Sequence, residues 1–159
     1  RSVLERGGFE LVRQQISFGG QYQWAICRPG REEATGAPDG SLALAESYGA
    51  RESSFLERAT AGLEEAARRG ACVIWGMATK GVVFASLMRE GLIAGGVDSN
   101  VRKQGRYAPG SGLEIHSPQW LTQLDGSATG FVMNPNYLQE MRDELNRLGA
   151  NIELRPIAS

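Results

Sequence analysis

Apolar and polar positions alternate along the chain in two distinct patterns. From residue 41 to residue 69, apolar side chains recur at three- and four-residue steps, which predicts an amphipathic helix that Gly70 ends. Beyond Gly70, short apolar runs typical of buried strands alternate with helical patterns. The predicted strands cover residues 71–75, 92–97, 114–116, 129–133 and 151–154, and the predicted helices cover residues 82–90, a segment that begins at Ser117-Pro118, and residues 137–148.

This alternation predicts the α/β class, with a Rossmann-like open, mainly parallel sheet and helices on both of its faces. The chain before residue 41 follows a different pattern. Residues 8–16 and 21–28 have the pattern of two strands joined at Gly19-Gly20, which predicts a β-hairpin, and residues 29–40 have the composition of a linker. Because a lone hairpin is marginally stable in water, we expect it to join strands upstream of Arg1 or to pack on the rest of the chain.

Composition narrows the function classes. The 159 residues suffice for one compact domain with some additional chain. The formal net charge of −1 indicates neither nucleic acid nor an acidic membrane as a partner, and no apolar run approaches the roughly 20 residues that span a bilayer. Cys27 and Cys72 lack the spacing of a zinc site, so we expect no metal and two buried thiols in a reducing compartment.

The first candidate loop lies between the strand at 71–75 and the next predicted helix. A glycine turn at the start of a helix presents backbone N–H groups and the positive end of the helix dipole to an anion. The candidates for phosphate binding there are Gly76, Thr79, Lys80 and Gly81. The bulk of Met77 and Ala78 argues against close approach of a phosphate. The alternative is a plain turn in which Lys80 is solvated.

The second candidate loop covers residues 98–110. Asp98 follows a predicted strand, where a Rossmann unit places the acid that binds a ribose hydroxyl. Lys103, Arg106 and Tyr107 supply cations and a ring that suit a phosphate with a stacked base or sugar. The alternative is a solvated loop in which Asp98 caps a turn.

The third candidate loop contains Asn134 and Asn136, after the predicted strand at 129–133. Their side-chain amides are able to bind hydroxyl groups of a sugar or ribose. The alternative is helix capping, for which Asn136 is well placed before the predicted helix at 137–148.

Together the three loops resemble the C-terminal domain of S-adenosylmethionine-dependent C-methyltransferases that act on nucleotide-activated deoxysugars and related substrates. The resemblance covers roughly residues 71–154. In that family small residues, often Ala-Gly, follow the first glycine, and Met77-Ala78 departs from this. The matching segments, in the family's order, are Val73-Ile74-Trp75-Gly76 with Lys80-Gly81, Val97-Asp98-Ser99-Asn100 with Lys103-Gln104-Gly105-Arg106-Tyr107 and Pro109-Gly110, Ile115 with Ser117-Pro118, and Asn134-Pro135-Asn136-Tyr137 with Glu140.

The segment from Gly8 to Tyr22 is similar to the end of a class I methyltransferase domain, whose last two strands form an antiparallel hairpin. The resemblance implies three parts. Residues 1–28 would be the terminal hairpin of an upstream methyltransferase domain, residues 29–50 a linker, and residues 51–159 the Rossmann-like C-terminal domain with its linking helix. Gln21 and Tyr22, at the hairpin loop, would then be able to face the substrate.

The resemblance also implies that the parent protein is a transferase and that this chain alone is inactive. S-adenosylmethionine, the general base and, in many members, a small zinc module belong to the upstream domain, so we expect no catalytic residue and no cofactor here. We do not nominate His116, the single histidine, as the base. The implied partners are the upstream domain and a nucleotide-linked small molecule, in the cytoplasm; a homodimer is left open.

Two other functions remain open. A stand-alone nucleotide-binding or regulatory module would explain the loops and the missing base, but not the unpaired hairpin. A vestigial Rossmann-like domain that serves only packing or dimerisation would explain Met77-Ala78, but not the cations Lys80, Lys103 and Arg106.

Overall fold

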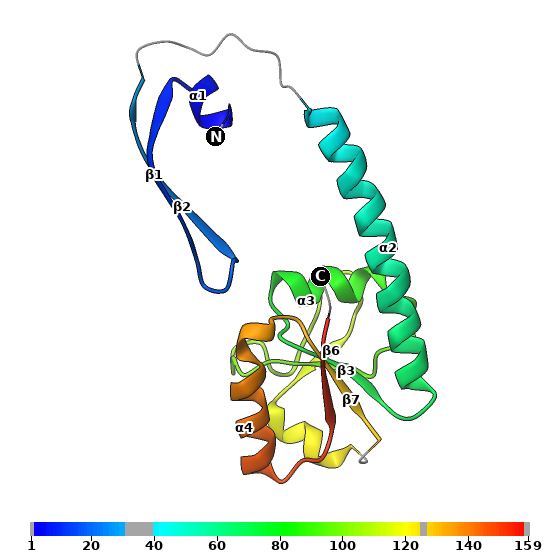
Figure 1. Ribbon diagram of the computed structural model, residues 1–159. Coiled ribbons are helices and arrows are strands. Elements are labelled where there is room, and N and C mark those ends of the chain that lie inside the picture. The colour runs from blue at the N-terminus through cyan, green and yellow to red at the C-terminus, as the bar shows by residue number, and fades with distance from the viewer. Residues whose placement is uncertain (1, 31–39, 125–126, 158–159) are drawn as a thin grey trace. The chain divides into compact units, whose positions relative to one another are not determined.

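The computed structural model describes residues 2–30, 40–124 and 127–157 of the chain. It divides into two compact units, Arg1–Arg51 and Glu52–Ser159. A long helix, α2 (Ser41–Ala67), runs across the boundary between them. The order of the helices and strands confirms the α/β class that the sequence pattern predicts (Figure 1).

The first unit contains the predicted β-hairpin. Strand β1 (Phe9–Ser17) pairs antiparallel with β2 (Tyr22–Pro29), with a bulge between Leu11 and Arg13. At the turn, Gly19 and Gly20 have φ angles of 59° and 85°, a left-handed conformation that glycine adopts without steric cost. A short helix, α1 (Ser2–Arg6), precedes β1; its five residues are too few to produce a helical sequence period.

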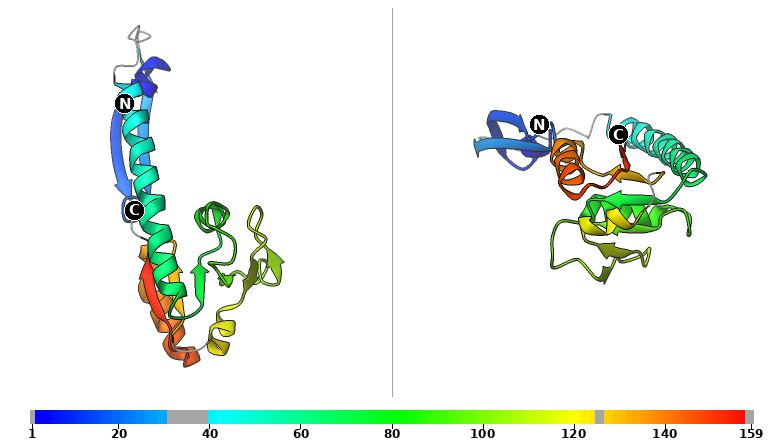
Figure 2. Two further views of the ribbon diagram at one scale, coloured as in Figure 1. Left: turned by 90° about the vertical axis from the view of Figure 1, so that its right-hand side faces the viewer. Right: turned by 90° about the horizontal axis from the view of Figure 1, so that it is seen from below.

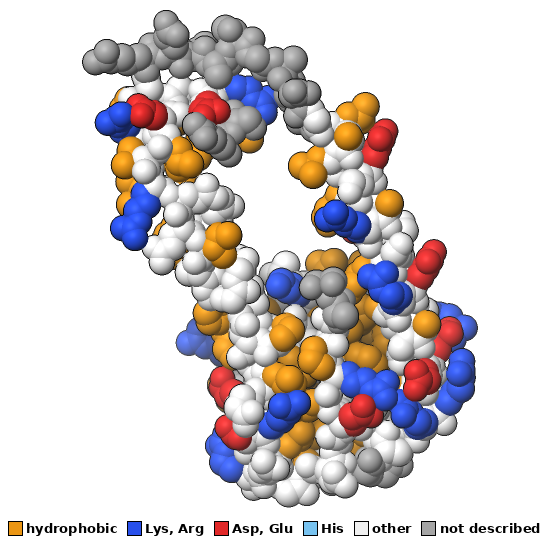
Figure 3. Space-filling view, in the orientation of Figure 1, with side chains coloured by type: hydrophobic (Ala, Val, Ile, Leu, Met, Phe, Trp, Pro, Cys, Tyr) orange, Lys and Arg blue, Asp and Glu red, His pale blue; other side chains and the backbone are white. Residues whose placement is uncertain are grey.

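Large apolar side chains lie open to solvent on the hairpin and on the first half of α2 (Figure 3). The two faces of the hairpin both carry them, since Ile16 and Trp24 are about two-thirds exposed and point to opposite sides of the pleat. Across one face, Arg28 pairs with Glu10 and holds the pKa of that carboxyl below its usual value. The exposed apolar residues are Phe9, Val12, Ile16, Phe18, Tyr22, Trp24 and Ile26 on the hairpin and Leu42, Leu44 and Tyr48 on α2.

A six-stranded sheet forms the centre of the second unit, in the order β5-β6-β4-β3-β7-β8. All neighbours are parallel except β5, which runs antiparallel to β6 at one edge. Numbered along the chain, the parallel strands follow the order 3-2-1-4-5 of a Rossmann-like sheet. The strands are β3 (Cys72–Trp75), β4 (Gly95–Val97), β5 (Arg106–Tyr107), β6 (Glu114–His116), β7 (Thr129–Val132) and β8 (Glu153–Pro156).

Helices cover both faces of this sheet, as predicted (Figures 1 and 2). On one face, Leu63 of α2 and Phe84 of α3 (Thr79–Leu87) pack with Ile74 of β3 in a common core. On the other face, Leu145 of α4 (Leu138–Leu148) packs with Val73 of β3. A 3₁₀ helix, η1 (Pro118–Gln123), joins the second core through Leu121, and a second one, η2 (Pro135–Tyr137), precedes α4.

Several element boundaries differ from the sequence prediction. Helix α3 begins at Thr79 rather than at residue 82, because its first turn is made of polar and small residues that show no apolar period. The polar segment after Asp98 was expected to be a loop throughout, yet it contains the exposed edge strand β5. The helix after Ser117 is 3₁₀ rather than α, and the last strand ends at Pro156, where an edge strand tolerates proline.

The two cysteines differ in burial. Cys72, in β3, is 2 % exposed, and burial raises the pKa of its thiol. Cys27, in β2, is half-buried, so the expectation of two buried thiols is wrong for Cys27.

Two glycines provide a matched test of the packing of the second unit. A Cβ atom at Gly81, in the first turn of α3, would lie 2.2 Å from the carbonyl oxygen of Gly76, whereas a Cβ atom at Gly62, inside α2, would meet no atom within 4 Å. We expect Gly81→Ala to lower the free energy of unfolding by about 1–3 kcal/mol, because backbone cannot move aside cheaply. We expect Gly62→Ala to raise it by about 0.5–1 kcal/mol. Urea denaturation followed by circular dichroism measures both; equal effects would contradict the packing described.

Candidate functional site

The predicted binding loops of the second unit lie where an open α/β sheet places its ligands. Strand β3 is followed by α3 and then by β4 on one side, while β7 lies on the other side of β3. The chain therefore leaves the adjacent strands β3 and β7 toward opposite faces of the sheet. Beyond the carboxyl ends of such strands a crevice forms, and ligands of this class of fold bind in it.

The loop after β3 is held close to the sheet by glycines. Gly76 has a φ angle of 106° and donates its backbone N–H to the carbonyl of Val97 at the end of β4, at 2.9 Å. Gly81 lies against the carbonyl of Gly76, and Gly96 lies against the side chain of Met77. Met77 is 2 % exposed, so its bulk fills the core above Gly96. The Met77 side chain therefore points into the core rather than toward solvent, and the approach of a phosphate to this loop stays a prediction.

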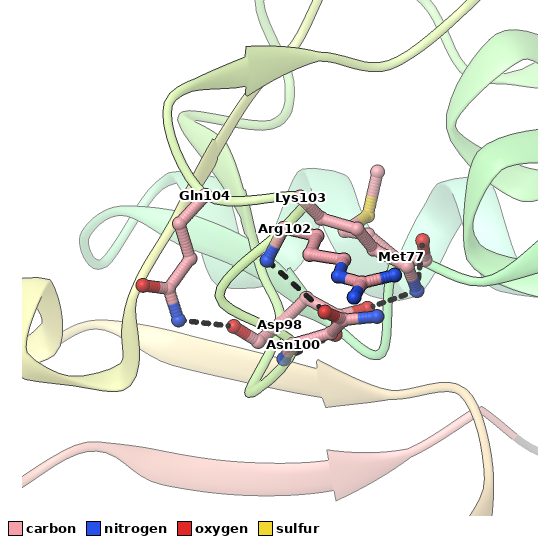
Figure 4. Close-up of polar contacts among 6 residues, drawn as sticks. All are labelled: Met77, Asp98, Asn100, Arg102, Lys103 and Gln104. Carbon is pink, nitrogen blue, oxygen red and sulfur yellow. Dashed lines mark hydrogen bonds and ion pairs between the residues drawn. The ribbon is translucent and has the colours of Figure 1, made fainter.

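The loop after β4 is organised around Asp98, which is buried (Figure 4). One carboxylate oxygen accepts a hydrogen bond from the backbone N–H of Asn100 at 2.9 Å, as in a turn cap. The other accepts one from the Lys103 ammonium group at 2.7 Å. Gln104 donates from its side chain to the backbone carbonyl of Asp98 at 3.0 Å. Asp98 therefore takes the capping role that was weighed against ribose binding.

Lys103 also connects the two loops. Its ammonium group donates a second hydrogen bond, of 3.1 Å, to the carbonyl of Met77 in the loop after β3 (Figure 4). An ammonium group has three donors, and two of them serve this bridge, so among the described residues one donor of Lys103 is left for a ligand. Sequence reasoning placed both Asp98 and Lys103 in the site but did not foresee that they bind each other. Their contact with a substrate stays a prediction.

The remaining cations and the ring of Tyr107 are exposed to solvent. Thr79 and Lys80 are exposed in the first turn of α3, whose N-cap residue, Ala78, makes no side-chain capping bond. Arg106 and Tyr107 are exposed in β5, which β6 and β4 separate from β3. The structure thus brings together Gly76, Gly81, Asp98 and Lys103, and the backbone N–H of Arg106 donates a hydrogen bond to the Lys103 carbonyl at 3.1 Å. The contact of Arg106 and Tyr107 with a substrate stays a prediction.

The first asparagine of the third loop bonds to the backbone of the same loop. The Asn134 side chain accepts a hydrogen bond from the backbone N–H of Asn136 at 3.1 Å and so caps η2. The N-cap position of α4 belongs to Tyr137. The expectation that Asn136 caps the final helix is therefore wrong. The 3₁₀ helix η2 lies directly before α4, and the side chain that caps it is that of Asn134.

A pocket of about 260 Å³ opens between the ends of β3 and β4 and the first half of α4. Gly76 and Asp98, two of the predicted ligand-binding residues, line it, and their contact with a ligand stays a prediction. Most of the other lining residues were not predicted, although Tyr137, Glu140, Met141 and Glu144 recur at the three- and four-residue spacing of one helix face. The lining residues are Trp75, Gly76, Asp98, Ser99, Tyr137, Glu140, Met141 and Glu144.

The two residues predicted to face the substrate from the hairpin belong to the first unit. Gln21 and Tyr22 are both exposed beside the hairpin turn, and the Tyr22 ring centroid lies 5.9 Å from that of Phe18. Their role toward a substrate stays a prediction.

The strand order and the loops at the switch point define the class of the second unit as a Rossmann-like domain. Residues 30–151 match the family model of the C-methyltransferase C-terminal domain. The chain therefore belongs to this family, and the family resemblance seen in its sequence is confirmed. A search among curated proteins finds no match. In the described part of the chain, no helix is long and apolar enough to cross a membrane.

The bridge made by Lys103 is testable because the chain has one other lysine, Lys80. We expect Lys103→Met to lower the free energy of unfolding by roughly 1–3 kcal/mol, because it leaves the buried Asp98 carboxylate without its cation. Lys80→Met, at an exposed position, should change it by less than about 0.5 kcal/mol. Denaturation curves of both variants give the comparison. Adding Asp98→Asn to Lys103→Met should recover part of the loss, and strictly additive effects would contradict the pairing.

Proposed function

We propose that this chain is the substrate-binding part of an S-adenosylmethionine-dependent C-methyltransferase that acts on a nucleotide-linked sugar or a similar small molecule. The methyl donor and the general base belong, in this proposal, to an upstream domain of the same polypeptide. The chain by itself then binds substrate but does not transfer a methyl group.

Family membership together with the site at the switch point of the sheet is the observation that carries the proposal. Within a C-methyltransferase, a Rossmann-like domain offers a crevice suited to a nucleotide, with Gly76 and the first turn of α3 on one side. Lys80 supplies positive charge for a diphosphate, and Lys103, whose charge is matched by Asp98, supplies a hydrogen-bond donor. Family membership also implies S-adenosylmethionine as the methyl donor in general.

The exposed hairpin supports an upstream partner. Its two strands carry large apolar side chains on both faces, as strands do when further elements cover a sheet on both sides. Such a hairpin is marginally stable by itself, so an upstream methyltransferase domain that completes the sheet would explain it. In that arrangement Gln21 and Tyr22 would approach the substrate. A cytoplasmic setting completes the proposal, since free thiols at Cys27 and Cys72 suit a reducing compartment.

One observation favours a second candidate, a domain that serves only packing. Asp98 and Lys103, two of the residues expected to contact a nucleotide, satisfy each other, and Asn134 caps a turn. A domain of this kind would keep the loops for stability and bind no nucleotide.

Titration of the ¹⁵N-labelled chain with nucleotides separates the two candidates. We expect a nucleoside diphosphate such as TDP, UDP, GDP or ADP to shift the backbone amides of residues 76–81, 98–107 and 134–137, because these loops surround the proposed site. S-adenosylmethionine should cause no specific shift. Amide shifts in the ¹H–¹⁵N spectrum are the measurement, and the base that binds most tightly would identify the nucleotide.

Silence toward every diphosphate would favour the packing domain. Specific binding of S-adenosylmethionine would contradict the assignment of the methyl-donor site to the upstream domain.

A further inference from the structure

The pocket between β3, β4 and α4 carries a more specific inference about what enters it. Its lining combines two apolar residues, Trp75 and Met141, with three acidic residues, Asp98, Glu140 and Glu144. No Lys or Arg is among its lining residues in the described part of the chain. A phosphate group would therefore find carboxylates and no cation among the side chains that line the pocket.

The three carboxylates are not equivalent. Asp98 is neutralised by Lys103, and Glu144 forms an ion pair with Arg147 one turn further along α4. Glu140 has no hydrogen-bond or ion-pair partner within the residues that the structure describes. It is exposed at the pocket, so its two oxygens are open to donors from a ligand. Because the other two charges are matched, the pocket offers acceptors without a strong net field.

Size sets a further limit. Pockets that enclose a whole drug-sized ligand have volumes of about 300–1,000 Å³. At about 260 Å³, this pocket suits one ring of a substrate rather than an entire nucleotide-linked sugar. A lining of apolar residues and carboxylate acceptors matches a sugar ring, whose C–H groups are apolar and whose hydroxyls donate hydrogen bonds.

We propose that this pocket binds a neutral, hydroxyl-bearing sugar ring, with Glu140 accepting hydrogen bonds from its hydroxyls and Met141 packing against its C–H face beside the buried Trp75. The inference rests on the proposed function and deepens it, because it separates the ring from the diphosphate. The diphosphate then lies outside the pocket, toward the first turn of α3 and Lys80. The ring has two sources, the ribose of the nucleoside and the transferred hexose.

The experiment uses the labelled 159-residue chain and follows the indole N–H signal of Trp75, assigned by Trp75→Phe among the three tryptophans. The probes are uridine, 2′-deoxyuridine, methyl glucoside, glucosamine, UDP, UDP-glucose and inorganic diphosphate. We expect a sugar-ring probe to shift Trp75 and the amides of Met141 and Glu144, and inorganic diphosphate to leave them unchanged. Uridine shifting them more than 2′-deoxyuridine identifies the ribose, and methyl glucoside shifting them identifies the hexose.

Glu140→Gln should weaken binding of the identified ring roughly tenfold, because it replaces a charged acceptor of hydroxyl hydrogen bonds. Asp143→Asn is the matched control on the same helix, since Asp143 bonds only Gln139 in the described structure and does not line the pocket. It should bind as the unchanged chain does. Glu140 also lies in the first turn of α4, where a negative charge favours the helix, so the amide spectrum of each variant verifies folding.

Four outcomes overturn the inference. They are an equal shift of Trp75 by inorganic diphosphate, tenfold tighter binding of glucosamine than of methyl glucoside, unchanged binding in Glu140→Gln, and silence of the pocket toward every ring. If UDP still shifts residues 76–81 while the pocket is silent, the proposed function survives and this inference fails. If a free sugar fills the pocket while no nucleoside diphosphate binds, the inference stands and the nucleotide proposal fails.

Discussion

The second unit depends on the close approach of the loop after β3 to the carboxyl end of β4. Gly81 and Gly96 lack side chains where the backbone and Met77 leave no room for them, and Gly76 has a φ angle of 106° that favours glycine. Together they allow α3 to lie close to the sheet. Lys103 then spans from Asp98 to the carbonyl of Met77 and fixes the two loops to one another. The distance between the two loops is set by the packing at the glycines and by the ion pair of Lys103 with Asp98. Gly76 and Asp98, one from each loop, therefore line the pocket at a fixed spacing.

The architecture was predictable because the buried strands are short apolar runs that alternate with helices. Residues 72–75 and 129–132, which lie at the centre of the sheet, gave the clearest signal. The edge strand β5 was missed because its two residues are exposed and polar, so pairing with β6 alone makes it a strand. The start of α3 was missed for a related reason, since its first turn packs through Gly81, which carries no side chain to mark a helix face.

The candidate site was predictable in its location and less so in its contacts. Strand ends and glycines indicated the loops at Gly76 and Asp98, and both line the pocket. The sequence could not reveal that Lys103 folds back five residues onto Asp98, because that contact depends on the shape of the turn at Asn100. Glu140 and Glu144 were not predicted as site residues, because the sequence shows α4 only as an amphipathic helix. The strand ends that each face of α4 meets depend on the order of the strands in the sheet.

The fit of Met77 over Gly96 has a consequence for how relatives of this chain can diverge. The space beside Gly96 of β4 has room for one side chain. Here Met77, from the loop after β3, fills it, and Gly96 has no side chain. A relative with a small residue at this position of the loop would leave that volume to be filled from the strand or from elsewhere in the core. Among related sequences, the side-chain sizes at the positions of Met77 and Gly96 should therefore be inversely correlated, so that an unusual residue at one predicts an unusual residue at the other.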